Sequence, residues 1–584
     1  MSDVDQGQKP RGLRTSLASR MQYGPAAPKQ SMQETSAVRK TMNAAARRLR
    51  AVASRFDADG AMAKHDALRR LALAPLAESA ALPLLYETLL FLRAHPSDRA
   101  MLAQLDAEFA RLASFLRRGR GHHGARLQEQ GLPFVEMTAR FTHDCMRWLL
   151  DHPHCRVTID SWGGGHADLN AILALTLPSV ERSETTASLD NAALLAALRV
   201  PIGRQLAFVI NELSRLDALP FVKDRLFDEL ELFVRVKPTD RRLSKAYSRL
   251  PMRTVHFQTD LLRHFDAAAL MNQRLPAARA LDSEALGEVV RVVKTSLLLT
   301  SRETDPGTYM DARTLRVWDL ERGLSVAIYG MVPARQMPLE SYVGFTLFKN
   351  GLAAAYGGAW VLGPRAGFGM NIFEPYRGGE SGYMMCQVLR TYRQAFGVDF
   401  FEVDAHQFGL DNPDGIATGA FWFYHRYGFR PLDGELAALA ECERRKIAAT
   451  PGCRSSEKTL LRLTGSNVAL NFGHAVPAHV FDFTLPVTRM VGRRHGGDRL
   501  AAERDAVAKF VGKTGATRRL KPDQQRVLAE VALVAEANAI SNRNQLAILR
   551  KMVAAKPVDL WAYQRLWFDF FASVPARAHR KGKA

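Results

Sequence analysis

The sequence predicts an α/β (α+β) protein in which a central mixed-sheet domain is flanked by mainly helical regions. Three observations predict this fold. Apolar residues recur at the three- to four-residue spacing of helices from about 36 to 285. They alternate in short runs separated by turn residues between about 310 and 432. After 435 the helical spacing returns, so the sheet-forming segment is enclosed on both sides.

The composition is typical of globular proteins, and the net charge is concentrated at the two ends of the chain. Hydrophobic residues make up 47% and charged residues 24% of the 584, which excludes a wholly disordered chain. Of the formal charge of +21, residues 1–50 carry +7 and residues 481–584 carry +11. Such basic ends indicate either solvated tails or contact with an anionic partner such as nucleic acid or lipid.

The same composition favours a cytoplasmic protein. No run of about 18 apolar residues is present, so we expect no transmembrane segment. The five cysteines are too few for a disulfide scaffold in a chain of this length and suit a reducing compartment. The start of the chain, Met1–Asp5, is acidic and is not typical of a secretory signal.

The first half of the chain is predicted to contain a tail and a helical domain. Residues 1–35 are rich in Gln, Ser, Gly, Pro and Arg, which predicts a disordered basic tail. Residues 36–285 are predicted to form a mainly helical domain, with further helical patterns at 192–216 and 221–236.

The segment that follows predicts an antiparallel meander of about four strands. Alternating or apolar runs occur at 315–320, 324–329, 342–348, 352–362 and 368–373. Glu321-Arg322-Gly323 separates the first two runs, and Asn350-Gly351 is a strong signal for a two-residue hairpin turn.

After the meander the pattern predicts a helix, a strand, a helix and a strand, followed by helices only. The expected elements are a helix at 383–396, a strand at 398–403, a helix at 415–427 and a strand at 429–432. Residues 435–584 are predicted to form a helical, basic region, with helices at 434–449, 522–540 and 558–573. We expect the last helix, which is very aromatic, to dock on the core.

The loop at the start of the first of these helices has the features of a phosphate site. A strand ends at Glu374-Pro375, a glycine-bearing loop runs from Tyr376 to Gly382, and a helix begins near Tyr383. A strand, a glycine loop and a helix N-terminus expose free backbone N–H groups at the positive end of the helix dipole. Arg377 can add a charge-assisted hydrogen bond.

A second segment strengthens this interpretation. Residues Ala420–Phe429 read Ala-Phe-Trp-Phe-Tyr-His-Arg-Tyr-Gly-Phe, a helix that ends at a glycine before a strand. Together the two segments resemble the GNAT superfamily of acyl-CoA-dependent N-acyltransferases, and the resemblance covers about residues 285–434. The residues that match its two motifs are Pro375, Tyr376, Arg377, Gly378 and Gly382, then Ala420, Phe423, Tyr424, Gly428 and Phe429.

The resemblance implies a GNAT-like domain at 286–434 that transfers an acyl group from acetyl-CoA or another acyl-CoA to an amine. It implies that the loop binds the coenzyme A pyrophosphate through Arg377, Gly378, Gly379, Ser381 and Gly382. It also implies that Tyr424 protonates the departing thiolate, and that strands 368–373 and 398–403 splay to admit the pantetheine arm. The large helical flanks favour a protein or polymer acceptor.

Two positions depart from the superfamily pattern. Glu380 replaces the second glycine of the loop, and a carboxylate beside a pyrophosphate is unfavourable unless it points away or pairs with a neighbouring arginine. The usual asparagine ahead of the tyrosine aligns with Ala417, although Asn412 lies five residues earlier.

An acyltransfer to an amine also requires a base. We name Glu374 at the strand end as the candidate, with Asp404 and His406 after the next strand as the others.

Two alternative functions remain open at this point. The domain can be a catalytically inactive GNAT-like binding or scaffold protein, which Glu380 and Ala417 motivate. It can also use an aminoacyl-tRNA donor, with the basic ends binding RNA. We expect no metal site, because the spacing of the nearby imidazole and thiol side chains does not match a zinc finger or ribbon. These side chains are His143, Cys145, His152, His154 and Cys155.

Overall fold

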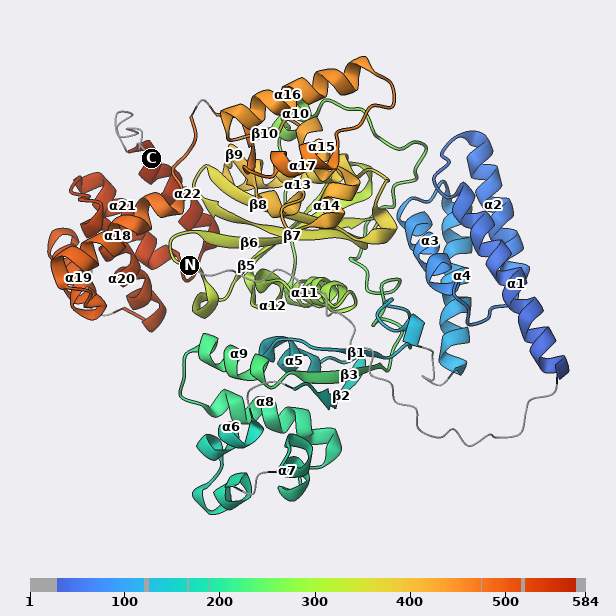
Figure 1. The fold of residues 1–584 in the computed structure, drawn as a ribbon, viewed down its shortest axis with the longest axis horizontal. Coiled ribbons are helices and arrows are strands. Elements are labelled where there is room, and N and C mark those ends of the chain that lie inside the picture. Colours follow the sequence, from blue (N-terminus) through green and yellow to red (C-terminus); the bar gives the residue numbers. More distant parts are fainter. Residues whose placement is uncertain are drawn as a thin grey trace.

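The computed structural model describes residues 29–119, 125–164, 168–186, 189–473, 475–515 and 520–573. The chain forms a central sheet domain that contacts an N-terminal helical bundle, a small α/β unit and a C-terminal helical bundle (Figure 1). The predicted tail is too long at its C-terminal end, because helix α1 (Lys29–Val52) already begins at Lys29. The rest of that tail and the basic run at 577–583 lie outside the described residues.

The central sheet confirms the predicted α/β class. In the described part of the chain it has eight strands in the order β10-β11-β9-β8-β7-β6-β5-β4, and all neighbours are antiparallel except β8 and β9. The strands are β4 (Met310–Asp319), β5 (Leu324–Met331), β6 (Ser341–Lys349), β7 (Leu352–Leu362), β8 (Arg365–Ile372), β9 (Phe400–Val403), β10 (Arg430–Pro431) and β11 (Val468–Asn471).

The two predicted turns of the meander are present. Gly323 has φ +69° between β4 and β5, and Asn350 and Gly351 have φ +46° and +83° between β6 and β7. Positive φ at both central residues is the geometry that Asn-Gly hairpins favour. The meander has five strands, one more than predicted, because the run after Asn350-Gly351 and the run at β8 both pair in full.

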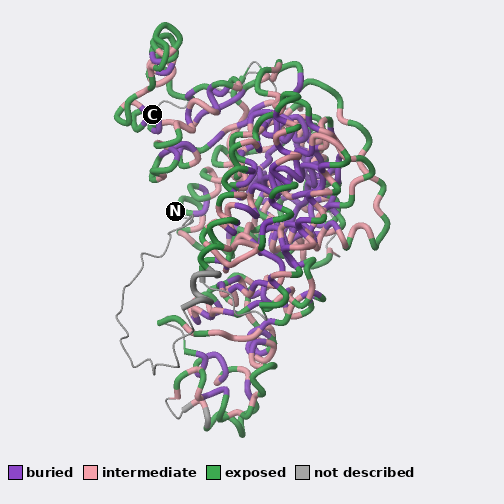
Figure 2. The backbone as a smooth tube through the Cα atoms, turned by 90° about the vertical axis from the view of Figure 1, so that its right-hand side faces the viewer, coloured by how far each residue is buried: buried purple, intermediate pink, exposed green. Residues whose placement is uncertain are grey.

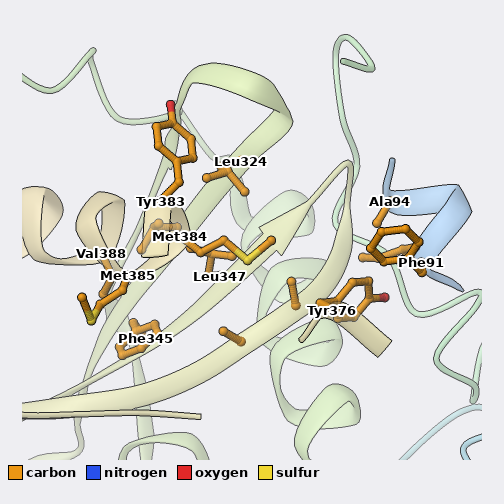
Figure 3. Close-up of a cluster of buried hydrophobic side chains, with 14 of the residues drawn as sticks. Phe91, Ala94, Leu324, Phe345, Leu347, Tyr376, Tyr383, Met384, Met385 and Val388 are labelled. Carbon is orange, nitrogen blue, oxygen red and sulfur yellow. The ribbon is translucent and has the colours of Figure 1, made fainter. Parts of the chain in front are cut away.

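Helices cover both faces of this sheet, which explains why every residue of β5 is buried. Helix α13 (Ser381–Phe396) packs on one face, where its Met384 and Val388 share a core with Phe345 and Leu347 (Figure 3). Helix α11 (Ser283–Leu298) packs on the other face. The buried residues accordingly gather in the middle of the molecule (Figure 2).

The sheet extends beyond the predicted domain boundary at residue 434. Strand β11 lies between β9 and β10, although helices α16 (Gly434–Ala449) and α17 (Glu457–Leu463) separate it from β10 in sequence. The prediction missed it because a four-residue strand shows no clear period.

The N-terminal half is not one helical domain. Helices α1 to α4 form a bundle whose side chains belong to the same core as α13 and the central sheet. Residues 137–243 form a separate unit with its own core and, in the residues described, a three-stranded antiparallel sheet of order β1-β3-β2. The remaining elements of the bundle and of this unit are α2 (Ala58–Leu73), α3 (Leu82–Ala94), α4 (Arg99–Arg118), β1 (Met137–Ala139), α5 (His143–Leu150), β2 (Cys155–Trp162), α6 (Leu169–Thr176), α7 (Asn191–Ala197), α8 (Gln205–Arg215), α9 (Pro220–Glu229) and β3 (Leu232–Pro238).

The helical pattern predicted at 221–236 is therefore wrong in its second half. Helix α9 ends at Glu229, and β3 begins at Leu232. Leu232, Val234 and Val236 are buried in alternation, which is a strand signal of period two.

The C-terminal region is helical after β11, and its last helix docks on the core as expected. Trp561 of α22 (Leu560–Ala572) stacks on Phe396 of α13 with ring centroids 4.4 Å apart. The other helices of this bundle are α18 (Val480–His495), α19 (Arg499–Thr514), α20 (Pro522–Ala537) and α21 (Arg543–Ala555).

Within the described residues no single helix is long and apolar enough to cross a membrane. The bent pair Asn191–Ala197 and Ile202–Arg215 passes the same test of length and composition when its two helices are taken together.

Asn350 joins the N-terminal bundle to the sheet. Its side-chain amide donates to the carbonyl oxygens of Ala94 (2.8 Å) and His256 (2.9 Å), and its Oδ1 accepts from the amide of His256 (2.9 Å). The side chain therefore satisfies three backbone groups at the point where the end of α3, the segment at 256 and the β6–β7 turn meet.

We predict that Asn350→Ala lowers the free energy of unfolding by about 2–4 kcal/mol, because these buried backbone groups lose their partners. The shift of the urea midpoint of the full chain measures this loss. Asn371→Ala, at an exposed position of β8, is the matched control and should leave the midpoint unchanged. Equal midpoints for the two variants would contradict this role of Asn350.

Candidate functional site

The candidate site lies at the connection between β8 and α13. The chain leaves β8, forms the 3-10 turn Glu374–Tyr376 and enters α13 at Ser381. Tyr376 is buried beside Phe91 and Ala94 of α3 (Figure 3), so the N-terminal bundle supports one side of the loop. Gly378 has φ +78°, which permits the sharp turn that follows.

The loop presents a row of backbone amides without acceptors. The N–H groups of residues 378–383 have no hydrogen-bond partner among the described residues, and the first helical bond is from the amide of Met384 to the carbonyl of Glu380 (2.9 Å). Unpaired amides at a helix N-terminus bind anions, because their dipoles add to the positive end of the helix. The predicted loop therefore has unpaired amides at a helix N-terminus, which an anion site requires.

Of the other two glycines of the loop, Gly382 permits close packing, while Gly379 has room for a Cβ. A Cβ at Gly382 would lie 1.7 Å from the hydroxyl oxygen of Tyr427, which covers the first turn of α13. A Cβ at Gly379 would lie 3.5 Å from the ring of Phe91. Tyr427 in turn stacks on Phe265, so side chains flank the loop on both sides.

The structure places Arg377 and Glu374 together on the surface. Arg377 donates from Nε to the carbonyl of Ile372 (3.1 Å), and its Nη1 lies 3.6 Å from Oε1 of Glu374. Their side chains are 64% and 72% exposed. Burial raises the pKa of Glu87 in α3, and the charge of Glu374 raises it as well, so Glu374 lies near the N-terminal bundle.

Tyr424 lies elsewhere, inside the core. Helix α15 (Ala420–Arg426) places its ring among Phe408, Phe423 and Phe429, and the residue is 5% exposed. Burial raises the pKa of Tyr424 above its usual range, so the phenol keeps its proton at neutral pH. The two predicted catalytic residues are thus not joined by any contact within the described part of the chain.

The sequence did not predict the environment of Glu380. Its carboxylate is fully buried and accepts from Lys349 Nζ (2.9 Å), from Arg322 Nε (2.9 Å) and from the amide of Leu262 (3.0 Å). Gln258 also donates to it (3.0 Å). The sequence predicted that this carboxylate must point away from a pyrophosphate or pair with a neighbouring arginine, and it does pair with one. It also pairs with Lys349, which the sequence did not indicate.

These partners keep Glu380 ionised. Burial alone would raise the pKa of its carboxyl, but the charge and hydrogen bond of Lys349, the Leu262 amide and Arg322 outweigh burial and lower the pKa to about 2. Lys349 donates further to Gln258 and to the carbonyl of Arg322. The negative charge of Glu380 is thus balanced within the network, and the carboxylate does not need hydrogen bonds from the loop amides.

Strands β8 and β9 separate next to this loop. They pair in parallel only through Arg365–Gly367 of β8 and Phe400–Glu402 of β9. Beyond Gly367 the edge of β8 has no strand partner on this side among the described residues. A Cβ at Gly369 would lie 3.7 Å from the side chain of Gln407, so the turn after β9 borders the separation.

That turn carries the other two candidate bases. His406 Nδ1 lies 2.7 Å from Asp404 Oδ1, and its Nε2 lies 3.6 Å from Asp411 Oδ2. The hydrogen bond to Asp404 raises the pKa of His406. Asn412 donates to the carbonyl of His406 (2.9 Å) and caps helix α14 (Pro413–Thr418), so Asn412 shapes this turn.

The histidines and cysteines at 143–155 serve packing and backbone contacts. His143 hydrogen-bonds to Asp144 (3.1 Å) and to the carbonyl of Ile210 (3.3 Å). Within the described ranges no group of three or more His, Cys, Asp or Glu side chains is arranged to hold a metal ion.

Comparisons of the chain with models of known protein families, with curated proteins and with solved structures find no match.

We predict that Glu380 makes the free energy of unfolding depend on pH in the acid range. Folding lowers the pKa of the Glu380 carboxyl from 4.5 to about 2, so the ionised carboxylate stabilises the fold at pH values above 4.5. This contribution is lost as the pH falls from about 4.5 towards 2. Glu380→Gln should lower the free energy of unfolding at pH 7 by about 3–5 kcal/mol, because it leaves Lys349 buried without its counter-charge. It should also flatten the pH dependence in that window.

Thermal unfolding at several pH values measures both effects. Glu374→Gln, six residues earlier and exposed, is the control and should behave as the parent chain. An unchanged acid profile in Glu380→Gln would show that other carboxyls dominate acid unfolding.

Proposed function

We propose that this protein is an acyl-CoA-dependent N-acyltransferase of the GNAT type. The observation that carries the proposal is the position of the unpaired amides of residues 378–383, beside the point where the parallel strands β8 and β9 separate. The motif resemblance at Tyr376–Gly382 and Ala420–Phe429 points to the same chemistry. Acetyl-CoA is the simplest donor.

The loop suits the anionic part of the donor. The amides supply hydrogen bonds to a pyrophosphate, and Arg377 on the surface beside them supplies positive charge. The pantetheine arm would then run along the free edge of β8, where a backbone N–H can polarise the thioester carbonyl.

The reaction is a direct transfer. The amine nitrogen attacks the thioester carbonyl carbon, the C–N bond forms, the C–S bond breaks, and the sulfur leaves as a thiolate. Because the pKa of Tyr424 is raised, we assign this phenol the donation of a hydrogen bond that stabilises the thiolate, in place of the full proton transfer predicted from an ordinary phenol pKa.

We assign the base to His406 and not to Glu374. His406 lies in the turn that borders the separation of β8 and β9, while Glu374 lies near the N-terminal bundle. Neutral His406 accepts the proton that the attacking ammonium must lose, and Asp404 stabilises the resulting imidazolium.

The ion pairs of Glu380 weaken the alternative that the protein is a catalytically inactive binding or scaffold protein. That alternative rested on Glu380 at the pyrophosphate site and on Ala417 in place of the usual asparagine, and of these two the Glu380 carboxylate has two cationic partners. The large helical parts on both sides of the sheet favour a protein or polymer acceptor.

Binding and turnover measured separately test the proposal. Calorimetry should detect acetyl-CoA binding, and Arg377→Ala should weaken it about tenfold through loss of a charge-assisted contact. Tyr424→Phe should leave binding unchanged and lower thiol release with a panel of primary amines by about a hundredfold. Arg70→Ala, an exposed arginine in α2, is the control. Absence of acetyl-CoA binding in the parent chain would refute the proposal.

The role of His406 predicts the direction of a pH effect. Turnover should rise as the pH passes upward through the pKa of His406, because only the neutral ring accepts a proton. Asp404→Asn removes the main cause of the raised pKa, so the midpoint of kcat/KM against pH should move to lower pH. A midpoint that is the same in the parent, Asp404→Asn and His406→Gln would exclude His406 as the base.

A further inference from the structure

A second concave surface lies on the far side of α15. It is a groove of about 1240 Å³ bounded by α14, α15, α16 and α17, which we call the arginine groove. Its lining includes no residue of the loop at 374–383 or of β8 and β9. It shares Asp411 and Asn412 with the turn that carries His406, so it opens beside that turn and away from the loop. It is large enough for a small organic ligand.

The groove is lined by more arginines than carboxylates. Four arginines line it: Arg426, Arg430, Arg444 and Arg454. Only Arg444 forms an ion pair, with Glu441, within the residues that the structure describes. Two carboxylates also line the groove, but Asp411 lies near His406, and Glu457 lies in the first turn of α17. An anion placed here would gain charge-assisted contacts without breaking existing ion pairs.

Hydrogen bonds to the backbone hold Arg430 in place. Arg430 donates from Nη1 to the carbonyl oxygens of His425 and Phe429, both at 2.8 Å. Burial, together with the charge of Arg430, lowers the pKa of His425 to about 4, so this ring is neutral at physiological pH. The positive charge of the groove therefore comes from guanidinium groups, which match the geometry of phosphate oxygens.

Two aromatic side chains line the same groove as these arginines. Trp422 and Phe423 of α15 line the groove, and Trp422 Nε1 donates to Ser455 Oγ (3.1 Å), which fixes the indole ring. The lining also includes the aliphatic side chains of Ile416, Ile447, Leu460 and Leu461. Fixed aromatic faces beside arginines are the combination that binds a nucleobase and its phosphate.

We propose that the arginine groove binds a nucleoside phosphate, with the base against Trp422 and Phe423 and the phosphate on Arg426 and Arg454. The groove is close to the loop, because Phe423 packs edge-on against Tyr427, and Tyr427 covers Gly382. A ligand in the groove and a ligand at the loop are thus separated by one layer of aromatic side chains. The proposal does not depend on acyl transfer.

Calorimetry on the full chain with AMP, adenosine and inorganic phosphate tests this site. AMP should bind more tightly than either fragment. Arg426→Gln/Arg454→Gln should weaken AMP binding at least about tenfold, since both arginines are exposed and the double variant loses two charge-assisted contacts. Arg445→Gln, on α16 outside the groove, is the matched control and should bind as the parent does. Circular dichroism checks folding, and the loop variant Arg454→Gln serves alone if the double variant is unfolded.

Three results would overturn the proposal: AMP binding no tighter than adenosine, equal binding by the double variant and the parent, or equal weakening in Arg445→Gln. Loss of AMP binding in Arg377→Ala would instead place the nucleotide on the loop and would also overturn it. Adding acetyl-CoA to the AMP complex tests whether the nucleotide bound in the groove is part of the acyl donor or a separate ligand. Displacement of AMP assigns the groove to the nucleotide end of the donor, and simultaneous binding assigns it to a second ligand.

Discussion

The buried ion network around Glu380 connects the parts of the protein on which the candidate site depends. Glu380 begins α13, Arg322 lies in the β4–β5 turn and Lys349 ends β6, so one carboxylate ties a helix start to two hairpin ends. Removing one member would leave a charge without its partner in a place that water does not reach, which is far more costly than losing a surface pair. The network therefore keeps the N-terminus of α13 in one position relative to the sheet.

The rest of the site follows from that position. Because the Glu380 side chain is engaged below the loop, the amides that precede and follow it remain without acceptors. Next to them Asn350 secures the end of α3 to the β6–β7 turn, and Tyr376 buries the start of the loop under the same helix. The N-terminal bundle is thus part of the support of the loop, and a site that must order an anion gains from a rigid support.

The separation of β8 and β9 has a cause in the sheet itself. The strands pair for three residues only, and β9 then pairs on its other edge with β11, which comes from a distant part of the chain.

The same region forms both proposed sites, one on each side of α15. Tyr424 and Phe421 face the core, while Trp422 and Arg426 face the arginine groove. One short helix thus presents the Tyr424 phenol inwards and charged and aromatic side chains outwards.

The sequence by itself determined the α/β class, the two turns at Gly323 and Asn350-Gly351 and the start of α13, because each is encoded by local spacing and turn chemistry. The single helix predicted at 415–427 is wrong, because Gly419 with φ +65° divides this segment into α14 and α15. It also identified the difficulty at Glu380 and the remedy of a nearby arginine. Which arginine it is, and that Lys349 joins it, only the tertiary structure decided, since these partners lie 58 and 31 residues away. The same holds for β11, for the β1–β3 sheet and for the arginine groove. Strand pairing and charge pairing between distant segments have no local period, so they become visible only when the chain is folded.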